Sequence, residues 1–180
     1  MENTPVITPG EANLALTDVH RFFQYNRGFH FYTSDANEIS VIREQGEAGT
    51  LPYSYEAEQF TVLEEARDTV TGAIIAGAKP VYRFFNTATG SHLYTMDENE
   101  RGFITENLDN YNFEGINYYA FEEKPEDIET VPVFRLLNGI SGSHLFTIDQ
   151  NEVDFIRENL SHFSVEGDSG IAYHVFELET

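Results

Sequence analysis

One stretch of this chain occurs three times without a gap. VHRFFQYNRGFHFYTSDANE starts at Val19, VYRFFNTATGSHLYTMDENE at Val81 and VFRLLNGISGSHLFTIDQNE at Val133. Copies of one supersecondary unit fold by packing against each other, because a single copy cannot bury its apolar face alone. The repeat therefore constrains the fold more than any other feature of the sequence.

The repeats span residues 19–64, 81–122 and 133–178, and we predict a single domain over residues 16–180. Residues 1–15 are expected to be an acidic tail or linker, without the pattern of a signal peptide. Further linkers separate the repeats, at residues 65–79 and 123–132.

Each repeat is expected to contain the same elements in the same order. Two short strands form a hairpin around a polar turn, such as the turn that ends at Gly90. A capping box, Asp97-x-x-Glu100 in repeat two, then starts a helix of about three turns, and two more strands follow. We therefore predict a mainly β fold with one short helix per repeat. Three strand-strand-helix-strand-strand units close most economically into a pseudo-threefold, propeller- or trefoil-like domain.

The charge of the chain narrows its range of partners. The 180 residues include 31 acidic and 10 basic ones, for a formal net charge of −21. Such a surface repels nucleic-acid phosphates and anionic lipid headgroups, so we expect neither a nucleic-acid partner nor membrane insertion. Cysteine is absent, which excludes disulfides, thiolate metal sites and thiol catalysis.

The repeated segment also resembles the signature of a bacterial repeat family of unassigned function, V-Y-R-F-[FY]-N-x-x-[ST]-G-x-H-[FL]-Y-T. Repeat two matches this signature throughout, whereas repeat one has Gln24 and repeat three has Leu136, Leu137 and Phe146 at signature positions. Repeats of that family accompany secreted bacterial hydrolases and large surface proteins. The resemblance implies an extracellular or cell-surface accessory module within a larger multidomain chain, and it supplies no catalytic residue.

The predicted hairpin brings an arginine, a histidine and an aromatic residue to one face. With a four-residue loop at residues 87–90, Arg83 faces Tyr94 and Phe85 faces His92 across the strands. One hypothesis for this set is structural: glutamates pair the arginines, and the histidines tie the hairpin to the helix. The candidate glutamates are Glu38, Glu100 and Glu152 of the capping boxes, or Glu56, Glu114 and Glu166 of the following strands.

The other hypothesis is a carbohydrate site in each repeat. An aromatic ring would lie against the C–H surface of a sugar, while amide, arginine and histidine groups would bind its hydroxyls. Three weak sites on one domain would bind a polymeric glycan or cell-surface polysaccharide with avidity. The candidate ligand-binding residues are Arg21, His30, Tyr32, Asn37, Arg83, Asn86, His92, Tyr94, Asn99, Arg135, Asn138, His144 and Asn151.

The sequence offers ligands for two kinds of metal site. Acidic residues could hold calcium through oxygen ligands, although no D-x-[DN]-x-[DN]-G loop occurs. His30, His92 and His144 would form a three-histidine zinc site if all three faced the threefold axis. The sequence therefore implies no certain cofactor, and calcium remains a candidate.

Catalysis has little support in the sequence. Neither a G-x-S-x-G nor an H-E-x-x-H motif occurs. Ser91 precedes His92, but neighbours on a strand point to opposite faces and cannot act as a nucleophile and its base. We expect a non-enzymatic, lectin-like carbohydrate-binding module of an adhesin or beside a secreted hydrolase. The alternative is a structural or protein–protein interaction module of a surface protein, with or without calcium, whose linkers contact a partner.

Overall fold

The computed structural model describes residues 4–167 and 169–178, and the protein is mainly β. Its α-helices are α1 (Ala36–Glu47), α2 (Glu98–Asn107) and α3 (Gln150–Asn159), and a short 3-10 helix covers Pro9–Glu11. The strands are β1 (Val6–Ile7), β2 (Leu16–Gln24), β3 (Phe29–Thr33), β4 (Tyr53–Leu63), β5 (Ile74–Ile75), β6 (Ala78–Asn86), β7 (His92–Thr95), β8 (Tyr111–Phe121), β9 (Val131–Asn138), β10 (His144–Thr147), β11 (Phe163–Val165) and β12 (Ile171–Val175).

Each repeat begins with the predicted hairpin, and the predicted register is confirmed. In β6 and β7, Arg83 lies opposite Tyr94 and Phe85 opposite His92, and the hairpins β2–β3 and β9–β10 pair in the corresponding register. Gly90 ends the loop with a φ of 77°, a conformation that glycine reaches without strain. A helix follows each hairpin, also as predicted.

The end of each repeat differs from the prediction of two strands. Repeats one and two each finish in a single long strand, β4 and β8. Their pairing with β2 and β6 is interrupted by shifts of register, which bend the strand while it stays in the sheet. Only repeat three divides this strand, into β11 and β12, around the insertion at residues 167–170.

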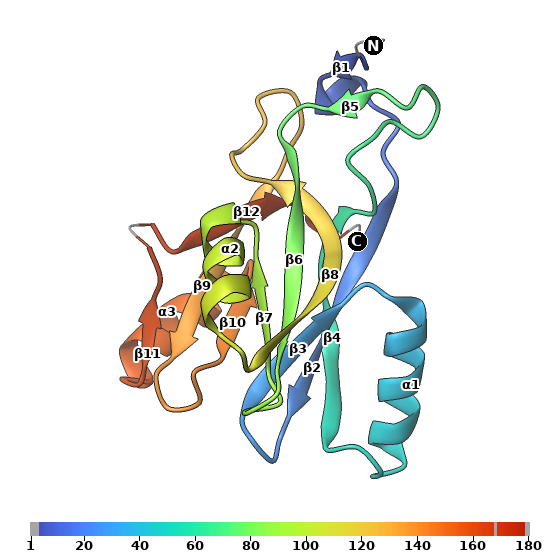
Figure 1. The fold of residues 1–180 in the computed structure, drawn as a ribbon. Coiled ribbons are helices and arrows are strands. Elements are labelled where there is room, and N and C mark those ends of the chain that lie inside the picture. The colour runs from blue at the N-terminus through green and yellow to red at the C-terminus, as the bar shows by residue number, and fades with distance from the viewer. Residues whose placement is uncertain (1–3, 168, 179–180) are drawn as a thin grey trace.

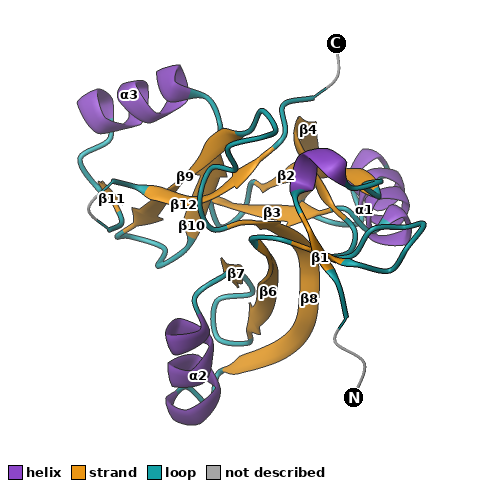
Figure 2. Ribbon diagram, turned by 90° about the horizontal axis from the view of Figure 1, so that it is seen from above, coloured by secondary structure: helices purple, strands orange, loops and turns teal. Residues whose placement is uncertain are grey.

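The repeats form one ten-stranded sheet whose path is open among the described residues. The main path runs β10-β9-β12-β8-β4-β2-β3, with the β6–β7 hairpin attached to β8 and β11 attached to β9. Side chains connect the two ends of this path, because the Tyr32 hydroxyl of β3 donates to the Phe146 carbonyl of β10 at 3.0 Å. Seen from above, the helices α1, α2 and α3 lie at three separate places around the strands (Figure 2).

The central core lies where the three repeats meet. It includes the first valine of each repeat, Val19, Val81 and Val133, all without exposed surface. Helix α3 adds a second, local cluster through Val153 and Ile156. In contrast, α1 buries no residue, which agrees with the weak apolar stripe of repeat one. No helix within residues 4–167 and 169–178 is long and apolar enough to span a bilayer.

Part of the segment before repeat one, predicted as a tail or linker, forms regular structure with the first linker. Strand β1 pairs in parallel with β5 from the linker at residues 65–79, at one end of the molecule (Figure 1). In the same linker Asp68, only 2% exposed, accepts hydrogen bonds from the backbone N–H groups of Asn13 and Thr71, each at 2.5 Å. Ala12 and Leu14 of the first segment and Ile75 of the linker also pack into one apolar cluster with Leu63 and Phe121 of the repeats.

Candidate functional site at the seams between repeats

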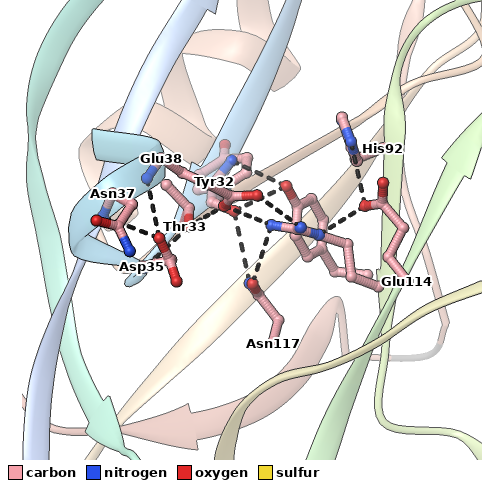
Figure 3. Close-up of polar contacts among 10 residues, drawn as sticks. Tyr32, Thr33, Asp35, Asn37, Glu38, His92, Glu114 and Asn117 are labelled. Atoms are coloured by element: carbon pink, nitrogen blue, oxygen red, sulfur yellow. Dashed lines mark hydrogen bonds and ion pairs between the residues drawn. The ribbon is translucent and has the colours of Figure 1, made fainter. Parts of the chain in front are cut away.

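The arginine of repeat two lies at the contact between repeats one and two, here called the 1–2 seam. Its terminal nitrogens each lie 2.8 Å from a carboxylate oxygen of Glu38 on α1, and its Nε lies 2.7 Å from Glu114 on β8. Figure 3 shows both glutamates, Glu38 near Thr33 and Glu114 near His92. Arg83 therefore binds one glutamate of the preceding repeat and one of its own, so both sets of candidate glutamates of the structural hypothesis are used.

The other two seams repeat this arrangement. At the 2–3 seam the residues are Arg135, Glu100 and Glu166, and at the 3–1 seam they are Arg21, Glu152 and Glu56. The arginine lies 2.8 Å from Glu100 and 2.5 Å from Glu166 in the former, and 3.0 Å from Glu152 and 2.6 Å from Glu56 in the latter. Each repeat thus gives its arginine to one neighbour and its helix glutamate to the other, and the three pairings form a cycle.

The pKa of five seam glutamates lies below its ordinary value, which favours their charged form. Burial raises the pKa of Glu38, but the hydrogen bonds from Arg83 and Thr33 outweigh burial, and the net pKa lies below its ordinary value. At Glu114 the hydrogen bond from His92 is the largest influence, and it lowers the pKa. The pKa is also lowered, against the effect of burial, at Glu56, Glu100 and Glu166.

The histidines face the glutamates of their own repeats and not a common centre. In repeat two the Nε2 of His92 lies 3.4 Å from Glu114, and the ring packs 4.7 Å from that of Phe31 in repeat one, centroid to centroid. Among the described residues, no group of three or more histidine or acidic side chains is placed to hold a metal ion. The three-histidine zinc site is therefore wrong, and the seams offer calcium no preformed cluster.

The capping prediction is correct for the aspartate and wrong for the glutamate. Asp35 accepts hydrogen bonds from the N–H groups of Asn37 and Glu38, each at 2.9 Å (Figure 3). The N–H of Asp35 donates to the Thr33 hydroxyl at 3.0 Å. This N–H, which the glutamate of a capping box would bind, is therefore already paired. Glu38 is thereby free for the stronger, bidentate partner Arg83. The threonine at this position in every repeat was not assigned a role from the sequence.

The tyrosines predicted to bind ligand are buried in the centre. Tyr32 and Tyr94 are each 1% exposed, and their rings meet the ring of Phe146 nearly at right angles, with centroids 5.6–5.7 Å apart. Their hydroxyls bind backbone groups of a neighbouring repeat. Neither ring can present a face to a sugar, so their assignment as ligand-binding residues is corrected to a core role.

The candidate asparagines fall into two groups. Asn86 and Asn138 begin the hairpin loops, and their side-chain oxygens accept hydrogen bonds from loop N–H groups, such as that of Ala88 at 3.0 Å. These two are turn residues with at most 9% exposure. The other three are exposed in the first turns of the helices: Asn37, Asn99 and Asn151.

Open pockets lie beside two of the seams. The pocket at the 2–3 seam has a volume of about 450 Å³, and the one at the 1–2 seam about 210 Å³. Four equivalent repeat positions line both pockets. They are Asp97, Glu100, Arg135 and Glu166 at the 2–3 seam, and Asp35, Glu38, Arg83 and Glu114 at the 1–2 seam. Asn117 also lines the smaller pocket, where Ala172 stands in the larger one. Sequence reasoning missed this pair, although the difference at a repeated position is visible in the aligned repeats.

A family model described as a domain of unknown function, DUF5648, matches residues 18–176. The match covers the three repeats except for the last two residues of repeat three, and it includes all three seams. No curated protein and no solved structure matches the chain.

Proposed function

This chain belongs to the DUF5648 family of domains of unknown function, and we propose that it is a non-catalytic carbohydrate-binding module with its sites in the seam pockets. One observation carries the proposal: two seams have open pockets, and each pocket is lined by two glutamates, an aspartate and an arginine at equivalent repeat positions. The four glutamates that line these two pockets keep about a third of their side-chain surface exposed, between 28% and 33%. Fixed carboxylates and a guanidinium suit adjacent sugar hydroxyls, which both donate and accept hydrogen bonds.

We further propose that the repeats form a pseudo-threefold, propeller- or trefoil-like domain. The cycle of arginine–glutamate pairs and the three separate positions of the helices support this arrangement (Figure 2). Equivalent pockets on one rigid domain would bind a repetitive glycan more tightly than any single pocket. An extracellular or cell-surface location, in an adhesin or beside a secreted hydrolase, belongs to the same proposal and rests on the family resemblance.

A glycan array tests the proposal when the pockets are blocked one at a time. Ala172→Trp fills the 2–3 pocket and Asn117→Trp the 1–2 pocket, and neither replaces a member of the arginine–glutamate pairs. Ile140→Trp, at a position 80% exposed, is the matched control. We expect wild type and control to bind one class of glycan, and each pocket variant to bind it more weakly at an unchanged melting temperature. Identical profiles for all four proteins, or a blank array with folded protein, would overturn the proposal.

A structural or protein-interaction module of a surface protein is the second candidate function. It is favoured by the internal pairing of the seam side chains, since Arg83 already has partners on both sides. In that case the seams serve only to lock the repeats together. Running the array with millimolar calcium and with chelator also separates a calcium-dependent lectin from a calcium-stabilised scaffold, because only the former changes its glycan profile.

A further inference from the structure

The segments outside the repeats come together in a pocket of their own. A cavity of about 430 Å³ is lined by Thr8 and Pro9, by the end of the first linker at residues 76–79, and by residues 121–127, where repeat two ends and the second linker begins. Figure 1 shows β1, β5 and the loop after β8 at the same end of the molecule. We call this cavity the linker pocket. Apart from Phe121 and Glu122 at the end of repeat two, its lining comes from non-repeated sequence.

The floor of the linker pocket is apolar. Pro9 is buried and Phe121 is 1% exposed, and the partly buried Ala76 and Pro125 extend the same lining. Gly77 has no side chain to cover this floor, where a Cβ would lie in ordinary contact with the Phe121 ring at 3.8 Å. An open pocket with an apolar floor and a few polar groups at its edge is the usual form of a site for one side chain of a ligand.

The rim of the linker pocket carries more negative charge than its lysines can neutralise. Lys79 pairs with Glu122, and Lys124 lies 3.3 Å from Glu129. Among the residues that the structure describes, the exposed carboxylates of Glu123 and Glu126 have no ion-pair partner. The rim therefore favours a cation beside the apolar floor, in a chain whose net charge of −21 already attracts basic partners.

We propose that the linker pocket binds an extended peptide segment of a partner protein, with one large apolar side chain on the floor and lysine or arginine on either side. The apolar residue supplies the anchor, and the flanking cations meet Glu123 and Glu126. This proposal is independent of glycan binding at the seams, because the linker pocket contains none of the arginine–glutamate–histidine residues there. If no peptide binds the linker pocket, the glycan-array test of the seam pockets is unaffected.

Amide chemical shifts of ¹⁵N-labelled protein test the proposal with three short peptides. Acetyl-Arg-Trp-Arg-amide is the probe, acetyl-Arg-Gly-Arg-amide removes the anchor, and acetyl-Glu-Trp-Glu-amide inverts the charge. We expect the probe to shift amides of residues 8–10, 76–79 and 121–127, with an affinity at least about tenfold above both other peptides. Equal affinity for the glycine peptide, or shifts spread over the whole acidic surface, would reduce the effect to unspecific charge attraction and overturn the proposal.

Variants then separate the floor from the rim. Ala76→Trp fills the floor, and Glu123→Lys combined with Glu126→Lys reverses the rim; each should weaken the probe about tenfold or more. Glu44→Lys combined with Glu47→Lys makes the same charge change on exposed positions of α1 and should alter the affinity less than about twofold. If the α1 variant weakens the probe as much as the rim variant does, the binding site is not the linker pocket. Melting temperatures confirm that each variant is folded.

Discussion

The hydroxyl of Tyr94 bridges the backbone N–H and C=O of Tyr32 in the neighbouring repeat, accepting at 3.0 Å and donating at 2.8 Å. The Tyr32 hydroxyl bridges the corresponding groups of Phe146 in the same way, at 2.9 and 3.0 Å. Phe146 occupies the third position of this cycle and has no hydroxyl to offer Tyr94. The ring of contacts at the centre of the domain is therefore incomplete at one of its three links.

Phe146→Tyr is expected to complete the cycle and stabilise the protein. The rings of Phe146 and Tyr94 already lie 5.7 Å apart at 84°, close to the 5.7 Å and 87° of the Tyr32–Tyr94 pair. A new hydroxyl in this position can bind two backbone groups and add about 1 kcal/mol to the free energy of unfolding. Urea denaturation measures the gain. Phe103→Tyr adds a hydroxyl at a site 58% exposed and should be neutral; a destabilised Phe146→Tyr would show that the central position has no room for the oxygen.

The seam ion pairs should be strongly coupled. Arg83→Met leaves Glu38 and Glu114 without their cation and is expected to cost about 2–3 kcal/mol, below the value for a fully buried pair because both carboxylates are partly exposed. Glu38→Gln alone should lower the free energy of unfolding by less than Arg83→Met does. The double variant should lose less than the sum of the two single losses, with a coupling energy of about 1–3 kcal/mol. Urea unfolding of the wild type, the two single variants and the double variant measures this coupling energy. Additive losses would mean that the bidentate contact contributes nothing to stability.

The register of the hairpins could be predicted from the sequence, whereas the partners across the seams could not. The pairing of Arg83 with Tyr94 follows from the length of one loop and the alternation of side chains along a strand. Its pairing with Glu38 joins residues 45 positions apart, and three equal repeats offer three equal candidates for that glutamate. Which neighbour supplies it depends on the direction in which the repeats follow each other, and no local spacing encodes that direction.

Burial was the second property that the sequence left undetermined. Arg83 and Tyr94 were correctly assigned to one face, but period-two alternation does not say whether that face points to solvent or to other repeats. The same limit affected residues 1–15 and 65–79, where β1 and β5 pair without any repeated pattern. Both features depend on contacts between segments far apart in the chain.

Calcium should stabilise the protein no more than magnesium does at equal ionic strength. No three acidic or histidine side chains converge as metal ligands in the part of the chain that the structure describes, so divalent cations act only by screening the net charge of −21. Melting temperatures in calcium chloride, in magnesium chloride and with chelator test this expectation. A rise of the melting temperature specific to calcium would reveal a site formed only on binding.

Removal of the Asp68 carboxylate should loosen the end of the molecule that carries β1 and β5. Hydrogen bonds from Thr71 and Asn13 hold the pKa of Asp68 well below its ordinary value, so the carboxylate is charged and fully engaged. Asp68→Ala leaves these donors unpaired, and we expect faster hydrogen exchange at residues 5–14 and 69–76 with little change at the hairpins. Glu65→Ala, at a neighbouring exposed position, is the control. Uniformly faster exchange would mean that this end unfolds together with the repeats.

The stability of the domain should pass through a maximum between neutral and acid pH. The seam carboxylates with lowered pKa are Glu38, Glu56, Glu100, Glu114 and Glu166. Their ordinary value is 4.5, so their contribution is complete above that pH and is lost as the pH falls through the lower folded values. Protonation of exposed carboxylates has the opposite sign, because it relieves the repulsion within a chain of net charge −21.

At low salt we therefore expect the melting temperature to rise from pH 7 to about pH 5 and to fall below about pH 4. About 0.5 M sodium chloride should remove the rise, which depends on long-range repulsion, and leave the fall, which depends on partly buried pairs. Glu38→Gln, which lacks one of the five contributors, should melt lower at pH 7 and lose less between pH 4.5 and pH 3. Parallel curves for this variant and the wild type would show that the acid loss arises elsewhere than at the seams.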